Sequence, residues 1–430
     1  MKAEKISTPR GVRDILPEEQ KYFTFIKKVV RHRCRQSGFR RISTPVFEFT
    51  EVFTRGIGEE SDIVSKEMYT FEDRKGKSLC LKPESTAGIA RAYVDHGMKN
   101  LPKPLNLYYI EPHFRYDRPQ KGRFRQFHQF GVESIGEDSS SMDAQVIYLA
   151  WRILKDLQIE KNITLQINSL GDKDSLKNYL EDLINFYSGK ERSLCDDCKN
   201  RLSKNPLRLL DCKKEDCQIL ASVAPGIGDS LNPESKKKLE NLKGYLDDFG
   251  IKYEVNQKLV RGLDYYTGTV FEFVDKESGG QNTIAGGGRY DNLIEQFGGE
   301  KTAAVGFAAG VERIVDMMKE NKVHITSKDK LQVFVSHLGE EAKKKALPIL
   351  IKLREQGIKT VGVLGRDSMK SQMRAAASFG VNYTLILGVT EVRENKAILR
   401  DMNKGSQEKV PLDQCVEILH ERLKSGESSS

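Results

Sequence analysis

The most constraining feature of the sequence is a change of texture that occurs twice along the chain. Before residue 170, segments with the alternation of β-strands are mixed with helical segments. Residues 172 to about 250 are largely helical and rich in lysine, and β-like sequence then returns at 251–275 and 281–287. This pattern predicts one domain of the α+β class that is interrupted by a mainly helical insertion.

The last hundred residues show a different pattern. From about residue 330, strands and helices of ordinary length alternate, and a turn at 403–405 joins two further strands. This alternation predicts a separate small α/β domain. Residues 330–430 hold 17 Lys and Arg against 12 Asp and Glu, which favours a polyanionic partner such as nucleic acid; a solvated basic face is the alternative. The predicted boundaries are 1–170 and 251–325 for the α+β domain, 171–250 for the insertion, 330–425 for the α/β domain and 426–430 for a flexible tail.

The individual elements of the α+β domain follow from residue spacing. Apolar residues fall three and four apart over 18–36, which predicts an amphipathic helix, and Gly38 suits its C-terminal cap. Residues 84–97 also have a helical pattern. Strands are predicted at 68–72, 78–82, 105–116, 124–135 and 163–168.

Composition excludes several classes of protein. Hydrophobic residues make up 38% of the 430 residues and charged residues 30%, which is enough apolar material for a sizeable core and too much for a wholly disordered chain. No apolar run approaches the ~20 residues that span a bilayer, and the N-terminus lacks the apolar stretch of a signal peptide. Seven cysteines in so long a chain do not indicate an extracellular disulfide scaffold. We expect a cytoplasmic protein that does not enter a membrane.

The densest polar segment is 111–133. Gln129, Gly131 and Glu133 lie two residues apart on a predicted strand, so they share one face and form a small recess with a carboxylate wall. Such a recess suits an amine or a cationic ring. Arg115 could meet a phosphate, because a guanidinium binds two oxygens at once. The alternative is a charged hairpin on the surface, whose loop holds Arg118, Lys121, Gly122 and Arg123.

Two later segments also place polar groups in β-like sequence. In LVRGLDYY (259–266), a buried Arg261 would need a counter-charge or an anionic ligand, and a structural Arg261–Asp264 ion pair is the alternative. In AGGGRYD (285–291), three successive glycines let the backbone approach a ligand closely. A plain turn is the default for the second segment, since it matches no phosphate-binding motif.

Two further segments have stronger structural alternatives. Glu84 and Thr86 in LCLKPESTAG (79–88) stand where a helix should begin, and capping of that helix explains them without a ligand. AAVGFAAGVERI (303–314), taken alone, predicts a core helix that exposes a pair of charged residues, Glu312 and Arg313.

The cysteines include one cluster with the pattern CxxC, thirteen residues, then CxxxxC. Four thiolates could hold a structural zinc ion, although the second pair is wider than the usual knuckle; reduced thiols in a helical insertion are the alternative. These four are Cys195, Cys198, Cys212 and Cys217, while Cys34, Cys80 and Cys415 are isolated and expected in the core.

Taken together and in this order, these segments resemble the class II aminoacyl-tRNA synthetases, and specifically the histidyl-tRNA synthetase family. FRYDRPQKGRFRQFHQFGVE (114–133) is similar to class II motif 2, and GFAAGVERI (306–314) to motif 3. LVRGLDYY and AGGGRYD are similar to the family's two histidine segments. The resemblance begins at PRGVRDILP (9–17) and covers nearly the whole chain.

The resemblance implies both the fold and the reaction. The fold would be a class II antiparallel sheet flanked by helices, with a C-terminal α/β anticodon-binding domain. The reaction would ligate L-histidine to tRNA(His), using ATP with magnesium, through a histidyl-adenylate and with release of pyrophosphate and AMP. Members of the family are homodimers, and the corresponding interface here would be 18–48.

The resemblance also implies roles for individual residues. Arg115, Arg261 and Arg313 would be catalytic: Arg115 at the ATP α-phosphate, Arg313 at the γ-phosphate and adenine, and Arg261 at the α-phosphate and the histidine carboxylate. ATP would further contact Arg123 and Glu312. The tRNA acceptor end, with its extra 5′ guanosine, would meet Gln120, Lys121 and Arg123. Histidine would be bound by Glu84, Ser85, Thr86, Arg115, Gln129, Glu133, Arg261, Tyr265, Tyr266 and Tyr290. The sequence departs from the family pattern at Lys82 and Ser85, where Arg and Gly are usual.

Two other functions fit part of the sequence. A synthetase-like regulatory subunit of histidine biosynthesis would share the core but charge no tRNA; the intact LVRGLDYY segment and the full C-terminal domain argue against it. A generic RNA-binding protein would explain the net charge of +9 but not the recess of Glu84, Gln129 and Glu133.

Overall fold

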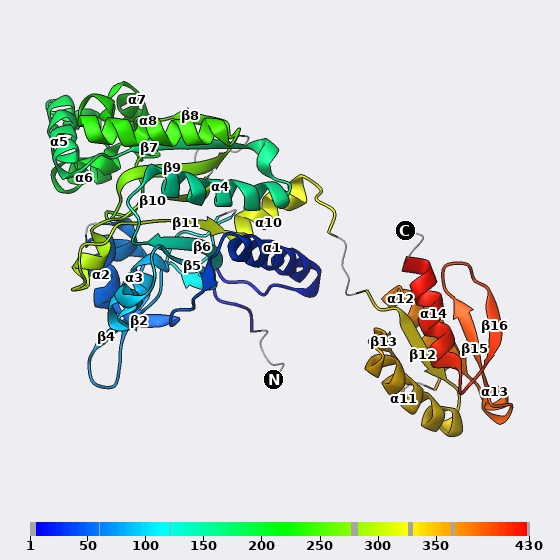
Figure 1. Ribbon diagram of the computed structural model, residues 1–430. Coiled ribbons are helices and arrows are strands. Elements are labelled where there is room, and N and C mark those ends of the chain that lie inside the picture. Colours follow the sequence, from blue (N-terminus) through cyan, green and yellow to red (C-terminus); the bar gives the residue numbers. More distant parts are fainter. Residues whose placement is uncertain are drawn as a thin grey trace, which may run out of the picture. The chain divides into compact units, whose positions relative to one another are not determined.

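An eight-stranded sheet forms the centre of the first part of the chain, in the order β1-β5-β6-β11-β10-β9-β7-β8 (Figure 1). The inner pairs are antiparallel, and the edge pairs β1/β5 and β7/β8 are parallel. This largely antiparallel sheet with helices on both faces confirms the predicted α+β class. The strands are β1 (Arg40–Arg41), β5 (Leu105–Phe114), β6 (Gln126–Ile135), β7 (Ile163–Ser169), β8 (Tyr253–Val255), β9 (Thr267–Asp275), β10 (Thr283–Arg289) and β11 (Ala304–Gly310).

The chain divides into two units, one up to residue 325 and the other from residue 326. The structure is a computed structural model, which describes residues 6–59, 61–120, 122–276, 283–325, 330–362, 365 and 367–427. Of the helices in those ranges, none combines the length and hydropathy needed to cross a bilayer.

Apolar cores lie on both faces of the large sheet, because consecutive side chains of a strand point to opposite faces. On β5, Tyr108 belongs to one core, while Leu107 and Tyr109 belong to the other. The first core is covered by α1 (Pro17–Gln36), α4 (Ser140–Asp156), α8 (Pro233–Asp248) and α10 (Val311–Glu320). The second is covered by α2 (Thr50–Ile57), α3 (Thr86–Asp95) and α9 (Leu293–Gln296).

Most predicted elements of this unit are present, but one prediction was wrong. Residues 304–310 form a strand in the middle of the sheet, where a helix was predicted, and α10 begins at Val311. A central strand is buried on both faces, so its short apolar run cannot be told from a buried helix by periodicity. The predicted exposure of Glu312 was also wrong, because only 5% of that residue is exposed.

A second, three-stranded sheet lies apart from the first. Its order is β2-β4-β3, and both pairs are antiparallel. The strands are β2 (Phe47–Phe49), β3 (Thr70–Glu72) and β4 (Ser78–Leu81), and the last two lie within the predicted strand ranges.

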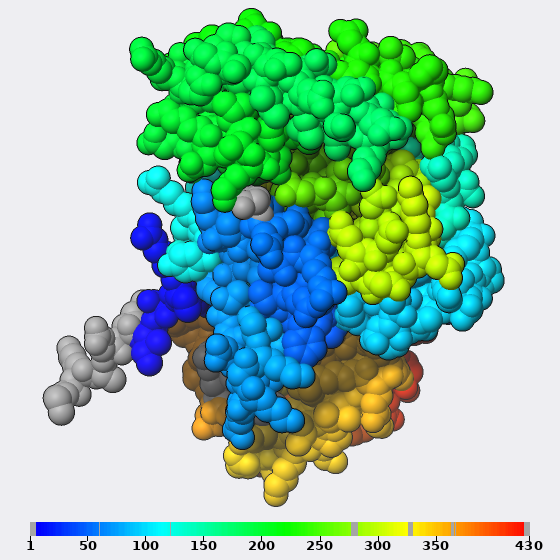
Figure 2. Space-filling view, turned by 90° about the vertical axis from the view of Figure 1, so that its left-hand side faces the viewer, coloured from blue at the N-terminus to red at the C-terminus, as the bar shows by residue number. Residues whose placement is uncertain are grey.

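Helices fill the sequence between β7 and β8. Figure 2 shows these helices, in green, lying across the segment around residues 50–70, in blue. Two ion pairs join the segments: Lys66 with Asp197 at 3.3 Å, and Arg201 with Asp62 at 2.7 Å. The helices have an apolar core of their own, which includes Cys198, Cys212 and Cys217. Cys195 packs against this core. They are α5 (Lys173–Tyr187), α6 (Asp196–Lys204), α7 (Glu215–Val223) and α8.

The second unit is a five-stranded sheet with helices, in the order β13-β12-β14-β15-β16. The pairs of β12 are parallel, and β14, β15 and β16 are antiparallel. The predicted α/β domain and the hairpin that turns at 403–405 are therefore present. The last helix ends at Glu427, so residues 428–430 of the predicted tail lie outside the described residues. The elements are β12 (Val333–His337), α11 (Glu340–Glu355), β13 (Thr360–Val361), α12 (Met369–Phe379), β14 (Tyr383–Leu387), α13 (Val389–Arg393), β15 (Lys396–Asp401), β16 (Gln407–Pro411) and α14 (Cys415–Glu427).

A buried ion pair ties α4 to the sheet and gives a test of the fold. Arg289 on β10 is 3% exposed and donates to Asp143 on α4 at 2.5 Å. Asp143→Ala would leave this guanidinium buried beside an apolar side chain, so we expect the free energy of unfolding to fall by about 3 kcal/mol. Urea unfolding followed by the fluorescence of Trp151, the single tryptophan and itself on α4, measures the change. Glu300→Ala, which breaks an exposed pair with Lys99, should leave the midpoint unchanged; an equal shift in both variants would contradict the argument.

Candidate active site

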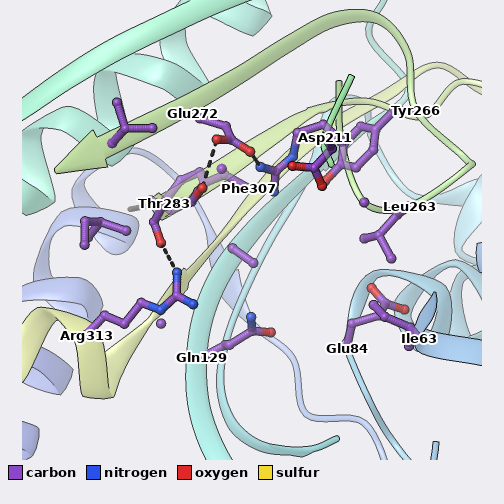
Figure 3. A pocket seen from close by; sticks show the side chains of 18 of the residues that line it. Ile63, Glu84, Gln129, Asp211, Leu263, Tyr266, Glu272, Thr283, Phe307 and Arg313 are labelled. Carbon is purple, nitrogen blue, oxygen red and sulfur yellow. Dashed lines mark hydrogen bonds and ion pairs between the residues drawn. The ribbon is translucent and has the colours of Figure 1, made fainter. Parts of the chain in front are cut away.

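A cavity of about 610 Å³ opens on the first unit, a size typical of small-molecule sites. Figure 3 shows Arg313 on one side of this cavity and Glu84 on the other, with Gln129 between them. Most residues that the sequence indicated for binding line it together, although they come from distant segments. They are Glu84, Thr86, Arg115, Arg123, Gln129, Glu133, Arg261, Tyr265, Tyr266, Tyr290, Glu312 and Arg313.

The predicted recess on β6 depends on two glycines. Gln129 and Glu133 share one face of the strand, with Gly131 between them. A Cβ atom at Gly131 would lie 2.4 Å from the Tyr109 hydroxyl, and one at Gly306 would lie 1.9 Å from Glu133 Oε2. Neither position therefore accommodates a side chain, and the glycines let a tyrosine and a carboxylate occupy the space above the sheet.

Glu133 is a buried acid in the lining of the cavity. It is 1% exposed, and it accepts hydrogen bonds from Tyr290 Oη at 2.5 Å and Thr86 Oγ1 at 2.8 Å. Burial raises the pKa of Glu133 to about 8; the two hydrogen bonds oppose this rise, and the charge of Glu84 adds to it. Near neutral pH, the carboxyl therefore gains from a ligand that donates hydrogen bonds or carries positive charge.

Glu84 caps a helix and also lines the cavity, so the two interpretations of the sequence do not exclude each other. Its carboxylate accepts from the backbone N–H of Thr86 at 2.7 Å and of Ala87 at 2.8 Å, which caps the start of α3. It also lines the cavity, where the Tyr265 hydroxyl lies 3.5 Å away. Burial raises the pKa of Glu84, so this carboxyl too favours a cationic neighbour.

Two residues that the resemblance assigned to binding, Ser85 and Gln120, do not line the cavity. Ser85 is buried and its hydroxyl lies 2.8 Å from His113 Nε2, so among the described side chains it is not one that lines the cavity. Gln120 is exposed on the loop, where it bridges to Arg123. Lys121 lies outside the described residues.

Arginines gather on the side of the cavity that includes α10. Arg313 donates to the backbone oxygens of Thr283 at 2.6 Å and Gly122 at 3.3 Å. Burial lowers the pKa of Arg313, and the charges of Arg123 and Arg115 lower it further. Like charges that are buried together are stabilised by an anion, so this side suits a ligand with several negative charges.

Glu312 joins the helix that carries Arg313 to the central sheet. Both of its oxygens lie 2.9 Å from the backbone nitrogen of His128, which donates to them, and Oε1 also lies 2.9 Å from His128 Nδ1. These contacts join the first turn of α10 to β6, and so they fix the backbone position of the neighbouring Arg313. The pattern of the sequence did not indicate this contact, since the two residues are far apart along the chain.

The counter-charge of Arg261 is Glu272 on β9, which the sequence analysis did not select. Glu272 forms an ion pair with Arg261 and also accepts from Thr283 Oγ1 at 2.9 Å. Glu272 lies between the buried Phe271 and Phe273 of β9, and an acid between two such residues was a usable signal. A Cβ atom at Gly286 would lie 2.5 Å from Arg261 Nη1, so the glycine run on β10 makes room for a guanidinium.

Lys82, which replaces the family's usual arginine, is a buried structural residue. It is 2% exposed, forms an ion pair with Glu111, and donates to the backbone oxygen of Thr44 at 3.1 Å. These contacts fix the position of Lys82, two residues before Glu84.

The insertion contributes to the site in a way that the sequence analysis missed. Asp211 and Lys213 line the cavity, on either side of Cys212. The four clustered cysteines have their sulfur atoms within 4.8 Å of one another, so they could hold one metal ion.

Known proteins resemble the chain over nearly its full length. The family model for histidyl-tRNA synthetase matches residues 11–314, and that for an anticodon-binding domain matches residues 332–422. A histidine–tRNA ligase of Dehalococcoides mccartyi is 46% identical over 95% of the chain and 98% of its own length. The corresponding enzyme of Bacillus subtilis is 44% identical over 96% of the chain and 97% of its own length.

A solved structure agrees with these relatives. The histidyl-tRNA synthetase of S. aureus without ligand superposes with a TM-score of 0.81 at 36% identity, and the match covers 96% of the chain and all of that structure. The shared sheet and the full-length similarity, together with a cavity that is cationic on one side and acidic on the other, lead to one conclusion: the chain belongs to the histidyl-tRNA synthetase family.

Proposed function

We propose that the protein activates L-histidine with ATP and transfers it to tRNA(His). The observation that carries this proposal is the convergence of Arg115, Arg261 and Arg313 on one cavity, whose other side holds the carboxyls of Glu84 and Glu133. A triphosphate and an amino acid, one anionic and the other with an ammonium group, fit these two sides.

In the first step, the residues act by position and charge. The histidine carboxylate attacks the α-phosphorus of ATP; a bond from that oxygen to phosphorus forms, and the bond to the β-phosphate oxygen breaks, with release of pyrophosphate. Arg115 and Arg261 would stabilise the charge at the α-phosphate, and Arg313 would hold the γ-phosphate end. Arg123 and Glu312 complete the proposed ATP side.

ATP would enter as its magnesium complex. Magnesium binds through one or two carboxylates together with phosphate oxygens and water. Glu67 and Asp117 line the cavity beside Arg115 and Arg123, so the residues present fit this requirement.

Histidine would occupy the acidic side. Gln129 Oε1 is buried and, within the described residues, makes no hydrogen bond, so an ammonium group would give it a partner. Glu84 and Thr86 would hold the same ammonium group. Glu133 and the tyrosines would hydrogen-bond the imidazole, and a pocket of this kind rejects apolar isosteres by ~10⁴ or more. The tyrosines are Tyr265, Tyr266 and Tyr290.

In the second step, the 3′ end of tRNA(His) would take the histidyl group from the adenylate and release AMP. Gly122 and Arg123 line the cavity, and Gln120, Lys121 and Arg123 would contact the acceptor end. The second unit, with its surplus of basic residues, would bind the anticodon. We place this reaction in the cytoplasm, and all seven cysteines are free, as a reducing compartment requires.

The protein would act as a homodimer. The sheet β2-β4-β3 exposes an apolar face: Phe47 is 57% exposed, Phe49 46% and Phe71 45%. Phe49 and Phe71 both stand opposite Leu79, so the rings lie along one face of the sheet. This face adjoins the interface 18–48 that the family implies, and a second copy would bury it.

Arg261→Ala tests the chemical step. Loss of the charge at the α-phosphate should lower kcat for histidine-dependent exchange of pyrophosphate into ATP by about 10²- to 10³-fold. Arg261→Ala combined with Glu272→Gln removes the carboxylate left unpaired, and should remain as slow. Arg55→Ala, at an exposed pair on α2, is the control. Near-normal exchange by the Arg261 variants would remove this residue from the mechanism, whereas exchange without tRNA charging in the parent would indicate a regulatory subunit.

The pKa of Glu133 predicts proton release on binding. The carboxyl is protonated below about pH 8 in the empty cavity, and a ligand that donates to it favours the ionised form. Histidine binding near pH 7 should therefore release more protons in the parent than in Glu133→Gln, and the affinity of the parent should rise more steeply up to pH 8. Calorimetry in two buffers of different ionisation enthalpy measures the release; equal values for both proteins would contradict this role of Glu133.

The proposed dimer can be separated from catalysis. Phe47→Glu places a charge on the exposed apolar face, and should shift the molar mass measured by light scattering from two chains to one at micromolar concentration. Ile184→Glu, on α5 and 43% exposed, should leave the dimer intact. A monomeric parent protein would refute the proposal.

A further inference from the structure

The four cysteines of the insertion meet at one point although they come from two separated pairs. Cys195 and Cys198 stand at the start of α6, and Cys212 and Cys217 stand around the start of α7. All four sulfur atoms lie within 4.8 Å of one another, and those of Cys195 and Cys212 are 3.8 Å apart. A disulfide needs about 2.05 Å, so the thiols are reduced.

These distances match the geometry of a single metal ion. Four sulfurs bound tetrahedrally at about 2.3 Å from zinc lie about 3.8 Å from one another. Three of the cysteines are buried and Cys195 is partly buried, so most of the cluster is shielded from solvent. Packing of thiols as ordinary apolar side chains does not require that four of them converge on one point.

Hydrogen bonds to the sulfur atoms support the same interpretation. The backbone N–H of Cys195 donates to Cys217 Sγ at 3.3 Å, and that of Lys214 donates to Cys212 Sγ at 3.5 Å. Such donors stabilise thiolates, which are the form that binds a metal ion. The wider CxxxxC spacing is accommodated because Lys214 lies between the second pair and turns its backbone toward the cluster.

We propose that Cys195, Cys198, Cys212 and Cys217 bind one structural zinc ion. Four thiolates leave no open position for water, which is the arrangement of structural rather than catalytic zinc. Zinc is favoured over an iron–sulfur cluster. The thiolates of such a cluster bind several separate iron atoms, whereas the four sulfur atoms here converge on a single point.

The ion would also hold part of the active site, an inference that rests on the proposed function. Between the two cysteine pairs lies a short 3₁₀ helix, Pro206–Leu209. Arg208 on it donates to the backbone oxygen of Arg261 at 3.4 Å and to Asp62 at 3.0 Å. Arg201 on α6 donates to the same Asp62 at 2.7 Å. Arg208 is therefore a positioning residue for the segment that carries Arg261.

Metal analysis of the full-length protein tests the site without reference to activity. Protein purified without chelator, or loaded with zinc chloride under reducing conditions, should hold one zinc per chain. X-ray absorption at the zinc edge should show four sulfurs at about 2.3 Å, and cobalt in its place should give the strong visible bands of a tetrahedral thiolate site. Iron in place of zinc, or four reactive thiols with no metal after loading, would overturn the proposal.

Variants distinguish these ligands from other cysteines. Cys198→Ser and Cys217→Ser should lose most of the bound zinc, whereas Cys34→Ser and Cys415→Ser, at isolated buried positions, should keep it. If the ligand variants do not fold, displacement of zinc from the parent by a mercurial reagent, with four thiols modified per ion released, answers the same question. Release of zinc with no link to these thiols would refute the assignment.

Arg208→Ala tests the connection to the active site. The variant should keep its zinc and should lower kcat for pyrophosphate exchange by about tenfold or more, with a smaller rise in KM for histidine, because the backbone of Arg261 loses its support. An unchanged kcat would refute the positioning role, while the zinc site would still be judged on metal content alone. Absence of exchange in the parent would refute the proposed function and leave the metal result unaffected.

Discussion

Positive charge that is buried on one side of a cavity is the constraint on which the first unit depends. Arg115 and Arg123 lie between β5 and β6, Arg313 lies on α10, and burial together with the charges of the other two lowers the pKa of Arg313. Arg123 pairs with Asp117, whereas Arg115 and Arg313 donate to backbone carbonyls, which hold the guanidinium groups but do not neutralise them. In the proposed function, bound ATP would supply the compensating negative charge, and the folded protein would place these positive groups before the substrate arrives.

The opposite side of the cavity holds buried carboxyl groups instead of buried arginines. Glu84 and Glu133 are buried, and burial raises the pKa of both. Hydrogen bonds from the start of α3 and from Tyr290 satisfy these carboxyls without a cation. In the proposed function, a substrate that carries an ammonium group and a ring N–H would bind here, with its carboxylate toward the arginines. Glycines at 131 and 306 make this juxtaposition possible, because side chains there would overlap the groups that bind.

The insertion is joined to this site by polar contacts rather than by the main apolar core alone. Asp62 receives both Arg201 and Arg208, and Arg208 reaches the backbone of Arg261. The cysteine cluster lies on the two segments that carry these arginines. A metal ion there would supply the rigidity that a small helical segment with a limited core lacks.

The sequence by itself determined many of the residues that line the cavity and the strand face that some of them occupy. Gln129 and Glu133 alternate with buried residues, and the glycine run 286–288 and the helix over 17–36 are local patterns, since the periods of strands and helices are set by the backbone. Only the tertiary structure decided which distant groups meet. It paired Arg261 with Glu272, placed Glu312 on His128, turned Ser85 to His113, and made the run before Val311 a strand by burying it on both faces. These outcomes depend on contacts between segments far apart in the chain, and no local pattern encodes a distance across a folded core.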